Sequence, residues 1–185
     1  MAWTGSGRDF QPGLHGFAGQ FSAGVNTRDS VPAAAIALAK HFEGFHRVPT
    51  FDPERRAHPY ICPAGFWTIG FGHLCDRDHP PITEDEAELY LAQDLMIALR
   101  ATLRYCPVLL TEPEGRLAAI VDFTFNLGAG RLQASTLRRR INQRDWTSAK
   151  LELRRWVHGG GRTQPGLVAR RHAECALAGG AVIKL

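Results

Sequence analysis

This sequence lacks the features by which several classes of protein are recognised. No stretch of 18 strongly apolar residues occurs among its 185 residues, which argues against a conventional membrane span. Its amino terminus has neither the basic nor the compact apolar segment of a secretory signal peptide. Its four cysteines form no CxxC pair, so they lack the pattern of a structural zinc site, and we expect reduced thiols. No internal repeat is present. We therefore expect one globular domain, without metal or cofactor and without a conventional signal peptide.

The charge of the chain is unevenly distributed. Residues 1–99 hold 7 Lys and Arg against 12 Asp and Glu, a net charge of −5, whereas residues 100–185 hold 15 against 6, a net charge of +9. A basic half suggests a polyanionic partner, such as nucleic acid, an anionic membrane or a wall polymer. A solvated basic surface explains the same charge equally well. Because no nucleic-acid-binding motif is found, we expect no nucleic acid partner. We also expect the protein to be a monomer.

Residues 1–29 form a Gly-rich, aromatic amino-terminal arm. Phe10, Leu14, Phe17 and Phe21 would share one face of a helix, but the glycines and Pro12 oppose helix formation. The arm either lays its aromatic side chains on the domain or, together with the basic helices, contacts an anionic membrane. Residues 30–185 are predicted to form the single remaining domain.

Apolar spacing and capping residues predict the helices of that domain. The first spans about 31–45, with Ser30 as its N-cap and an inward stripe of Ile36, Ala39, Phe42 and Phe45. The proline-rich segment 46–59 is predicted to be a long loop. After the strands that follow this loop, we expect only helices, near residues 83–104, 112–127, 135–143, 146–157 and 166–178. Their predicted caps are Thr83, Thr111, Asp145 and Gly179. Thr83 and Thr111 each begin a capping box.

Residues 62–74, CPAGFWTIGFGHL, are the segment around which the chain is organised. Their β-branched and aromatic residues alternate between turn residues, which predicts a short strand or hairpin. Glu43 ends the apolar helix that precedes them. A carboxyl group facing a hairpin that carries the Cys62 thiol and the Thr68 hydroxyl suggests the cleft of a hydrolase.

Several motifs together resemble the phage-type lysozymes of glycoside hydrolase family 24, which include the T-even phage enzymes. They are Glu43, CPAGFWTIGFGH, ITEDEAELYLAQDL, FTFNLGAG, STLRRRIN and RRWVHGGGRTQPGLVARR, in the family's order over residues 36–178. The resemblance implies an α+β, mainly α-helical, lysozyme-like fold. A small β-hairpin lobe at about 46–80 would be joined by a long helix to a larger helical lobe at about 83–179. It also implies a phage endolysin that acts on bacterial peptidoglycan, held in the host cytoplasm until lysis and then reaching the periplasm and cell wall.

The family's catalytic positions are a Glu, an Asp or Cys after eight intervening residues, and a Thr after five more. Cys62 and Thr68 keep the second spacing, but eighteen residues separate Glu43 from Cys62. We assign the surplus of ten to residues 48–57, as a loop at the mouth of the cleft. Asp52 lies at the family's spacing from Glu43, but no Thr follows at the required distance, so it is a minor candidate.

The resemblance makes Glu43 the general acid, on an apolar shelf of Phe42, Phe45 and Trp67 that would favour its protonated form. Thr68 would hold the attacking water. Cys62 would orient that water with Thr68 or interact with the developing positive charge.

The resemblance also implies supporting residues. His73 and Asp94 would form a buried structural pair between the strands and the long helix. Arg170 or Arg171 would pair with Glu43, and the expected substrate-binding residues are Asn126, Gly160 and Arg170.

Three other functions stay open at this point. A lytic transglycosylase also relies on one Glu in a lysozyme-like fold, and a chitinase would share the chemistry with another sugar. A wall-binding or membrane-disrupting module would need no catalytic acid. Activity of a folded Glu43 variant separates that last class from the enzymes, and the mass of the products separates a hydrolase from a transglycosylase.

Overall fold

The computed structural model describes residues 30–46, 48–62 and 65–183, so the predicted arm 1–29 lies outside the described residues. Helices make up most of the described chain, with one three-stranded and one two-stranded antiparallel sheet, which confirms the mainly helical α+β prediction. The elements in chain order are α1 (Ala33–Glu43), β1 (Tyr60–Ile61), β2 (Trp67–Ile69), β3 (His73–Leu74), α2 (Glu84–Tyr105), the 3-10 helix η1 (Pro107–Leu110), α3 (Glu114–Leu127), α4 (Ala129–Ala134), α5 (Thr136–Asn142), α6 (Trp146–Leu153), β4 (His158–Gly159), β5 (Arg162–Thr163) and α7 (Pro165–Ala178).

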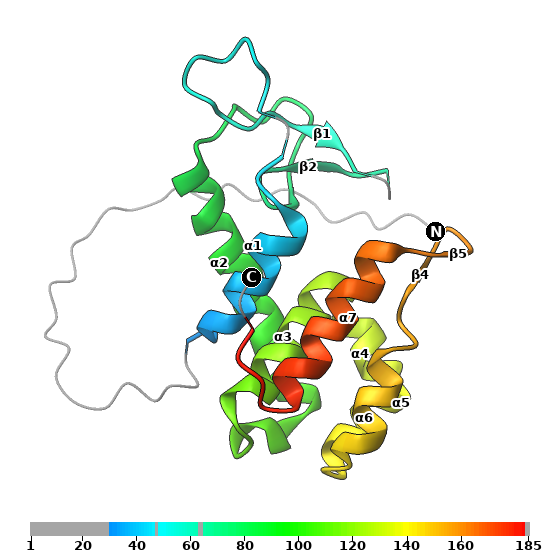
Figure 1. Ribbon diagram of the computed structural model, residues 1–185. Coiled ribbons are helices and arrows are strands. Elements are labelled where there is room, and N and C mark those ends of the chain that lie inside the picture. Colours follow the sequence, from blue (N-terminus) through cyan, green and yellow to red (C-terminus); the bar gives the residue numbers. More distant parts are fainter. Residues whose placement is uncertain (1–29, 47, 63–64, 184–185) are drawn as a thin grey trace, which may run out of the picture.

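Helix α3 is the centre of the helical part. All residues from 117 to 124 are buried, as expected for a helix that is apolar on every side and enclosed by its neighbours. Helices α1, α2 and α7 pack directly against it, and Figure 1 shows α7 running beside α3. This arrangement brings the end of α1 close to α7, although the two helices lie far apart in the sequence.

The three-stranded sheet has the order β1-β2-β3, with Tyr60 opposite Thr68 and Ile69 opposite His73. Its turn after β2 docks on α2. Gly70 has φ +60°, and a Cβ atom there would lie 2.7 Å from the Cβ of Ala87. Only glycine satisfies both the backbone conformation and the close approach. Figure 1 shows α2 running from the sheet down into the helical part.

The predicted capping box of α2 is confirmed. The Glu86 amide donates to the Thr83 hydroxyl at 3.2 Å, and the Thr83 amide donates to the Glu86 carboxylate at 2.8 Å. Asp145 caps α6 through the Ser148 amide, and Gly179 ends α7, both as predicted.

The predicted start and inward face of α1 are wrong. Pro32 has an extended backbone, with ψ 134°, so the helix begins at Ala33 and Ser30 does not cap it. The buried face consists of Ala35, Leu38 and Ala39, while three members of the predicted stripe are only half-buried: Ile36, Phe42 and Phe45. The face turned to the core is therefore rotated, because small alanines allow α1 to approach α3 closely. Glu43 still ends the helix.

The capping box predicted at Thr111 is also wrong. Thr111 ends η1 instead, and its hydroxyl donates to the Val108 carbonyl at 3.0 Å. Pro113 is extended, with ψ 143°, so α3 begins only at Glu114.

The expectation that only helices follow residue 83 is wrong at residues 158–163. There β4 and β5 form a hairpin with His158 opposite Thr163. Gly160 and Gly161 have φ +58° and +76°, so they supply the left-handed turn that ordinary residues disfavour. Helix α6 accordingly stops at Leu153 rather than at residue 157, and α4 is a short additional helix between α3 and α5.

Candidate active site

The Glu43 carboxyl group lies at the carboxyl end of α1, where α1 meets α7 and the strands. Its Oε1 accepts a hydrogen bond from Nη1 of Arg170 at 2.5 Å. A Cβ atom on Gly72, in the turn between β2 and β3, would lie 3.7 Å from its Oε2. The side chain is 29% exposed, so solvent and ligands can reach it. One carboxyl oxygen is thus fixed by the helical part, and the other faces the strands.

Arg170 is itself held by a buried partner. Its Nε and Nη2 donate to the two carboxylate oxygens of Asp122 on α3 at 2.9 and 2.8 Å, and both side chains are almost fully buried. Burial alone would lower the pKa of Arg170, but the carboxylates of Asp122 and Glu43 outweigh it and raise that pKa. The guanidinium therefore stays charged and rigidly placed.

The structure resolves which arginine reaches Glu43: it is Arg170. Sequence reasoning missed Asp122, although a signal for it was present. Asp122 is the acidic residue inside the apolar segment LAAIVDFTF, and a charge on a buried helix needs a partner.

Arg171 lies behind Arg170 and orients the predicted substrate-binding Asn126. Its Nη2 donates to the side-chain oxygen Oδ1 of Asn126 at 3.0 Å and to Oε1 of Glu174 at 2.6 Å. Asn126, Glu43 and Gln164 line a hollow of about 260 Å³ beside α7. The predicted Gly160 lies in the exposed turn of the β4–β5 hairpin, which leads into α7.

Thr68 lies on β2, and Cys62 directly follows the neighbouring strand β1. Cys62 is half-buried; its amide donates to the Phe66 carbonyl at 2.9 Å. Thr68 is opposite Tyr60 in the sheet, and its hydroxyl lies 3.4 Å from the Tyr60 carbonyl, to which it donates. All four cysteines of the chain lie in its described part, and each is a free thiol.

The predicted contact between His73 and Asp94 is present. Nδ1 of His73 lies 2.9 Å from Oδ2 of Asp94, and the Tyr90 ring stacks on the imidazole. The pair joins β3 to α2. The side chains are 28% and 27% exposed, so the pair is half-buried rather than buried as predicted, because it lies at the edge of the sheet.

Asp52 organises the long loop between α1 and β1. It is 6% exposed and accepts hydrogen bonds from His58 Nε2 at 3.0 Å, Arg56 Nε at 3.1 Å and the Glu54 amide at 2.9 Å. The bond from His58 is the main reason that the pKa of Asp52 lies below its usual value of 3.8, and the other two bonds act in the same direction, against burial. All three partners belong to the loop itself.

We expect Asp52→Asn to lower the melting temperature at pH 7 by a few degrees. The carboxylate is favoured in the folded state, so its stabilisation is complete above pH 3.8 and is lost as the pH falls through the lowered pKa. Thermal melts of both proteins between pH 7 and pH 2.5 test this, and the difference should close at the acidic end. A difference that persists there would mean that shape, not charge, holds the loop.

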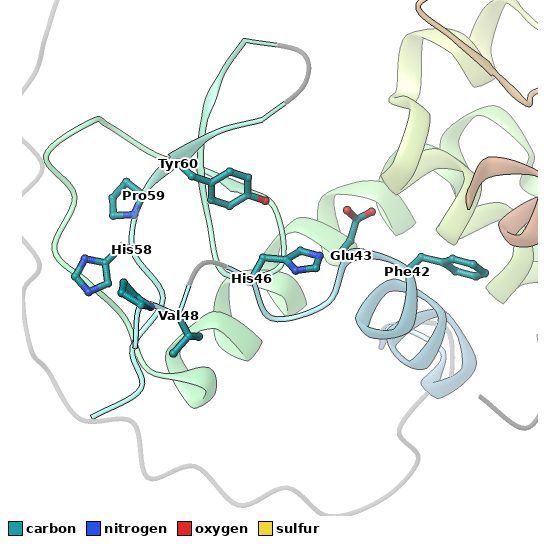
Figure 2. Close-up of a pocket in the computed structure, with 8 residues that line it drawn as sticks. Phe42, Glu43, His46, Val48, His58, Pro59 and Tyr60 are labelled. Atoms are coloured by element: carbon teal, nitrogen blue, oxygen red, sulfur yellow. The ribbon is translucent and has the colours of Figure 1, made fainter. Parts of the chain in front are cut away.

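A larger hollow of about 890 Å³ lies on the other side of Glu43, between the end of α1 and the long loop. Figure 2 shows the Glu43 carboxyl and the Tyr60 ring directed into it from opposite sides. Over the described residues, no group of three or more His, Cys, Asp and Glu side chains could hold a metal ion, and no helix is long and apolar enough to cross a membrane. The Glu43 carboxyl group therefore lies between two open hollows.

Comparison with known proteins identifies the family. The profile described as "Phage lysozyme" matches residues 40–174, which include Glu43, the strands and most of α7. The chain belongs to the phage lysozyme family. It is therefore a lysozyme-type glycoside hydrolase, as the sequence motifs predicted.

Individual relatives and solved structures agree with this family assignment. An endolysin of Acyrthosiphon pisum secondary endosymbiont phage 1 is 32% identical over 147 residues, covering 77% of this chain and 92% of the relative. A SAR-endolysin of Bacteriophage PS119 is 38% identical over 122 residues, covering 64% and 71%. Among solved structures, the muramidase domain of SpmX from Asticaccaulis excentricus has a TM-score of 0.66 and 26% identity, over 80% of this chain and 96% of that domain. The lysozyme-like fold is thereby confirmed.

Proposed function

We propose that this chain is a phage endolysin of glycoside hydrolase family 24, the family of the T-even phage lysozymes. It would hydrolyse the β-1,4 bond between N-acetylmuramic acid and N-acetylglucosamine, with Glu43 as general acid. The observation that carries the proposal is the placement of Glu43, whose carboxyl is oriented by a buried arginine and opens onto both hollows. Relatives named endolysins support it.

Glycoside hydrolysis needs a proton on the leaving oxygen as the bond to the anomeric carbon breaks. Arg170 holds Oε1, so Oε2 is the oxygen that delivers the proton. Because Asp122 engages the same guanidinium through two bonds, much of its charge is already compensated when it contacts Glu43. Arg170 therefore serves to orient the Glu43 carboxyl.

The attacking water comes from the strand side in this proposal. Thr68 lies on β2, and Cys62 directly follows the adjacent strand β1. Their hydroxyl and thiol would position the water that adds to the anomeric carbon. Asn126 and the β4–β5 turn at Gly160 would contact the sugars on the α7 side, where Asn126 lines the smaller hollow. The His73–Asp94 pair would keep the strands in register with α2.

We propose bacterial peptidoglycan as the partner and the periplasm and cell wall as the place of action. Several relatives are named SAR-endolysins, which supports release to the wall at lysis rather than action in the host cytoplasm. The proposed action needs no cofactor, because the proton donor and the groups that position water are all side chains of this chain.

The purified full chain should clear a suspension of isolated peptidoglycan, with one water added in total for each glycosidic bond cleaved. Mass spectrometry of the fragments tests this, because hydrolysis leaves a reducing end whereas a lytic transglycosylase leaves an anhydro sugar. Anhydro products would replace the hydrolase by the transglycosylase. Binding to the wall without any fragments would leave only the wall-binding module.

A further inference from the structure

Helix α3 carries a buried carboxylate to which the proposed reaction gives no chemical step. Asp122 is fully buried, and its two oxygens accept from Nε and Nη2 of Arg170 at 2.9 and 2.8 Å. Nη1 of the same guanidinium donates to Oε1 of Glu43 at 2.5 Å. Arg170 therefore joins a carboxylate inside the helical part to the carboxyl group at the open site.

The packing of α3 does not itself call for a charge at residue 122. Residues 117–124 are all buried, and an apolar side chain is often at least as stable as a buried ion pair at such a place. Arg170 does call for one. It is 3% exposed, its guanidinium lies 5.5 and 5.8 Å from the rings of Phe42 and Phe125, and a buried cation without a partner is costly. Asp122 therefore serves the arginine that reaches Glu43.

The Asp122 carboxylate also changes the charge that Glu43 meets. Arg170 stays charged, because the carboxylates around it raise its pKa against the effect of burial. Arg170 and Asp122 together carry no net charge, whereas Arg170 alone would present a full positive charge to Glu43. An uncompensated arginine favours the ionised form of a neighbouring carboxyl group, which then loses its proton at a pH lower by roughly 1–3 units.

Other titratable or charged residues also face these groups. In the described part of the chain they are His46, His58 and Tyr60, which line the larger hollow with Glu43, and Arg171 and Glu174, which lie behind Arg170 on α7. Burial raises the pKa of Glu174, and Arg171 beside it acts in the opposite direction. All of them are retained when Asp122 alone is changed, so a comparison of the two proteins reports on the charge of Asp122.

We propose that Asp122 is a positioning residue for the reaction, which fixes Arg170, takes up its charge and so sets the pH range in which Glu43 can donate a proton. The proposal rests on the proposed function, in which Glu43 is the general acid. Asp122 has no exposed surface and cannot touch a substrate. It acts through the guanidinium alone, by the two bonds that hold it and by the charge that it cancels.

The test is the pH dependence of peptidoglycan clearing by the full chain carrying Asp122→Asn. The amide has the size of the carboxyl group, and its oxygen can still accept from the guanidinium, but it carries no charge. A general acid is lost as the pH rises, so we measure the alkaline midpoint, the pH at which the rate has fallen to half its maximum on the alkaline side. We expect this midpoint to lie about one pH unit lower in Asp122→Asn than in the unchanged protein.

Glu112→Gln is the matched control. Glu112 is also a buried carboxylate that binds guanidinium groups, those of Arg116 and Arg144, but it precedes α3 and has no bond to Arg170. Its loss reports what the removal of a buried ion pair does through stability alone. The melting temperature of Glu112→Gln should fall, whereas its alkaline midpoint should equal that of the unchanged protein.

A double substitution separates charge from packing. Asp122→Asn combined with Arg170→Gln removes both charges, so Glu43 no longer meets an uncompensated cation. The maximal rate should fall, because the Glu43 carboxyl loses the group that orients it. Its alkaline midpoint should nevertheless return to that of the unchanged protein or lie above it.

An unshifted alkaline midpoint in folded Asp122→Asn would overturn the proposal and leave Asp122 with a structural role. The same downward shift in Glu112→Gln or in the double variant would overturn it as well, since charge would not be the cause. If Asp122→Asn does not fold, Asp122→Ser makes the same change of charge with a smaller group and carries the same expectation. The proposed function fails separately, if the unchanged protein does not cleave peptidoglycan or if Glu43→Gln keeps its activity.

Discussion

Glu43→Gln is expected to reduce the lysis of purified peptidoglycan by about 100-fold or more, which is the usual contribution of a general acid. The amide has the size of the carboxyl group, and its oxygen can still accept from Nη1 of Arg170. It cannot deliver a proton to the leaving oxygen. The loss should therefore appear in the rate of clearing of a peptidoglycan suspension, measured at equal protein concentration.

Two controls make the Glu43 result specific. Glu88→Gln makes the same change of charge on the exposed face of α2 and should lyse peptidoglycan at the rate of the unchanged protein. The melting temperature of Glu43→Gln should hold or rise, because a carboxyl group at a cleft is rarely the most stable choice for the fold. Near-normal turnover by a folded Glu43→Gln protein would remove Glu43 from the mechanism.

Cys62→Ala is expected to lose most of the lytic activity, while Cys62→Asp keeps a measurable part of it. The family resemblance matches Cys62 to a position that holds Asp or Cys, so a carboxylate should position the water or stabilise the positive charge in place of the thiol. A methyl group can do neither. Rates of peptidoglycan clearing for the two variants, compared with the unchanged protein, provide the measurement.

A small thiol reagent gives an independent test of Cys62. Burial raises the pKa of Cys106 to about 12 and also raises the pKa of Cys75 and of Cys175, so these thiols are poor targets. The reagent should inactivate the unchanged protein and leave any residual activity of Cys62→Ala as it is. Full activity of Cys62→Ala would show that the thiol only packs, and Thr68 would then be the remaining candidate for positioning the water.

The helices could be predicted from the sequence where local signals determine them. Thr83 and Asp145 cap their helices with side chains that reach amides three residues on, so their effect is visible in a short window. Thr111 shows the limit, because a proline two residues later prevents the helix from starting there. The β4–β5 hairpin was missed because strands of two residues carry no measurable period.

The candidate site depended on contacts that local patterns do not encode. The motif order suggested that Arg170 or Arg171 pairs with Glu43, but the choice depends on the rotation of α7 against α1. Asp52 looked like a spare catalytic carboxylate by its distance from Glu43 in the sequence. In the structure its side chain is turned into its own loop, where it contacts His58 and Arg56. Spacing along the sequence does not reveal the direction of a side chain.

The bond between Arg170 and Glu43 also sets an order of events during synthesis. Glu43 leaves the ribosome early, while Arg170 is added 127 residues later, on the last helix described. At about 5–20 residues per second, translation separates the two by several seconds. Until α7 has emerged and docked, a nascent chain contains Glu43, the proposed proton donor, but not the arginine that orients its carboxyl. The oriented carboxyl is therefore among the last parts of the molecule to form.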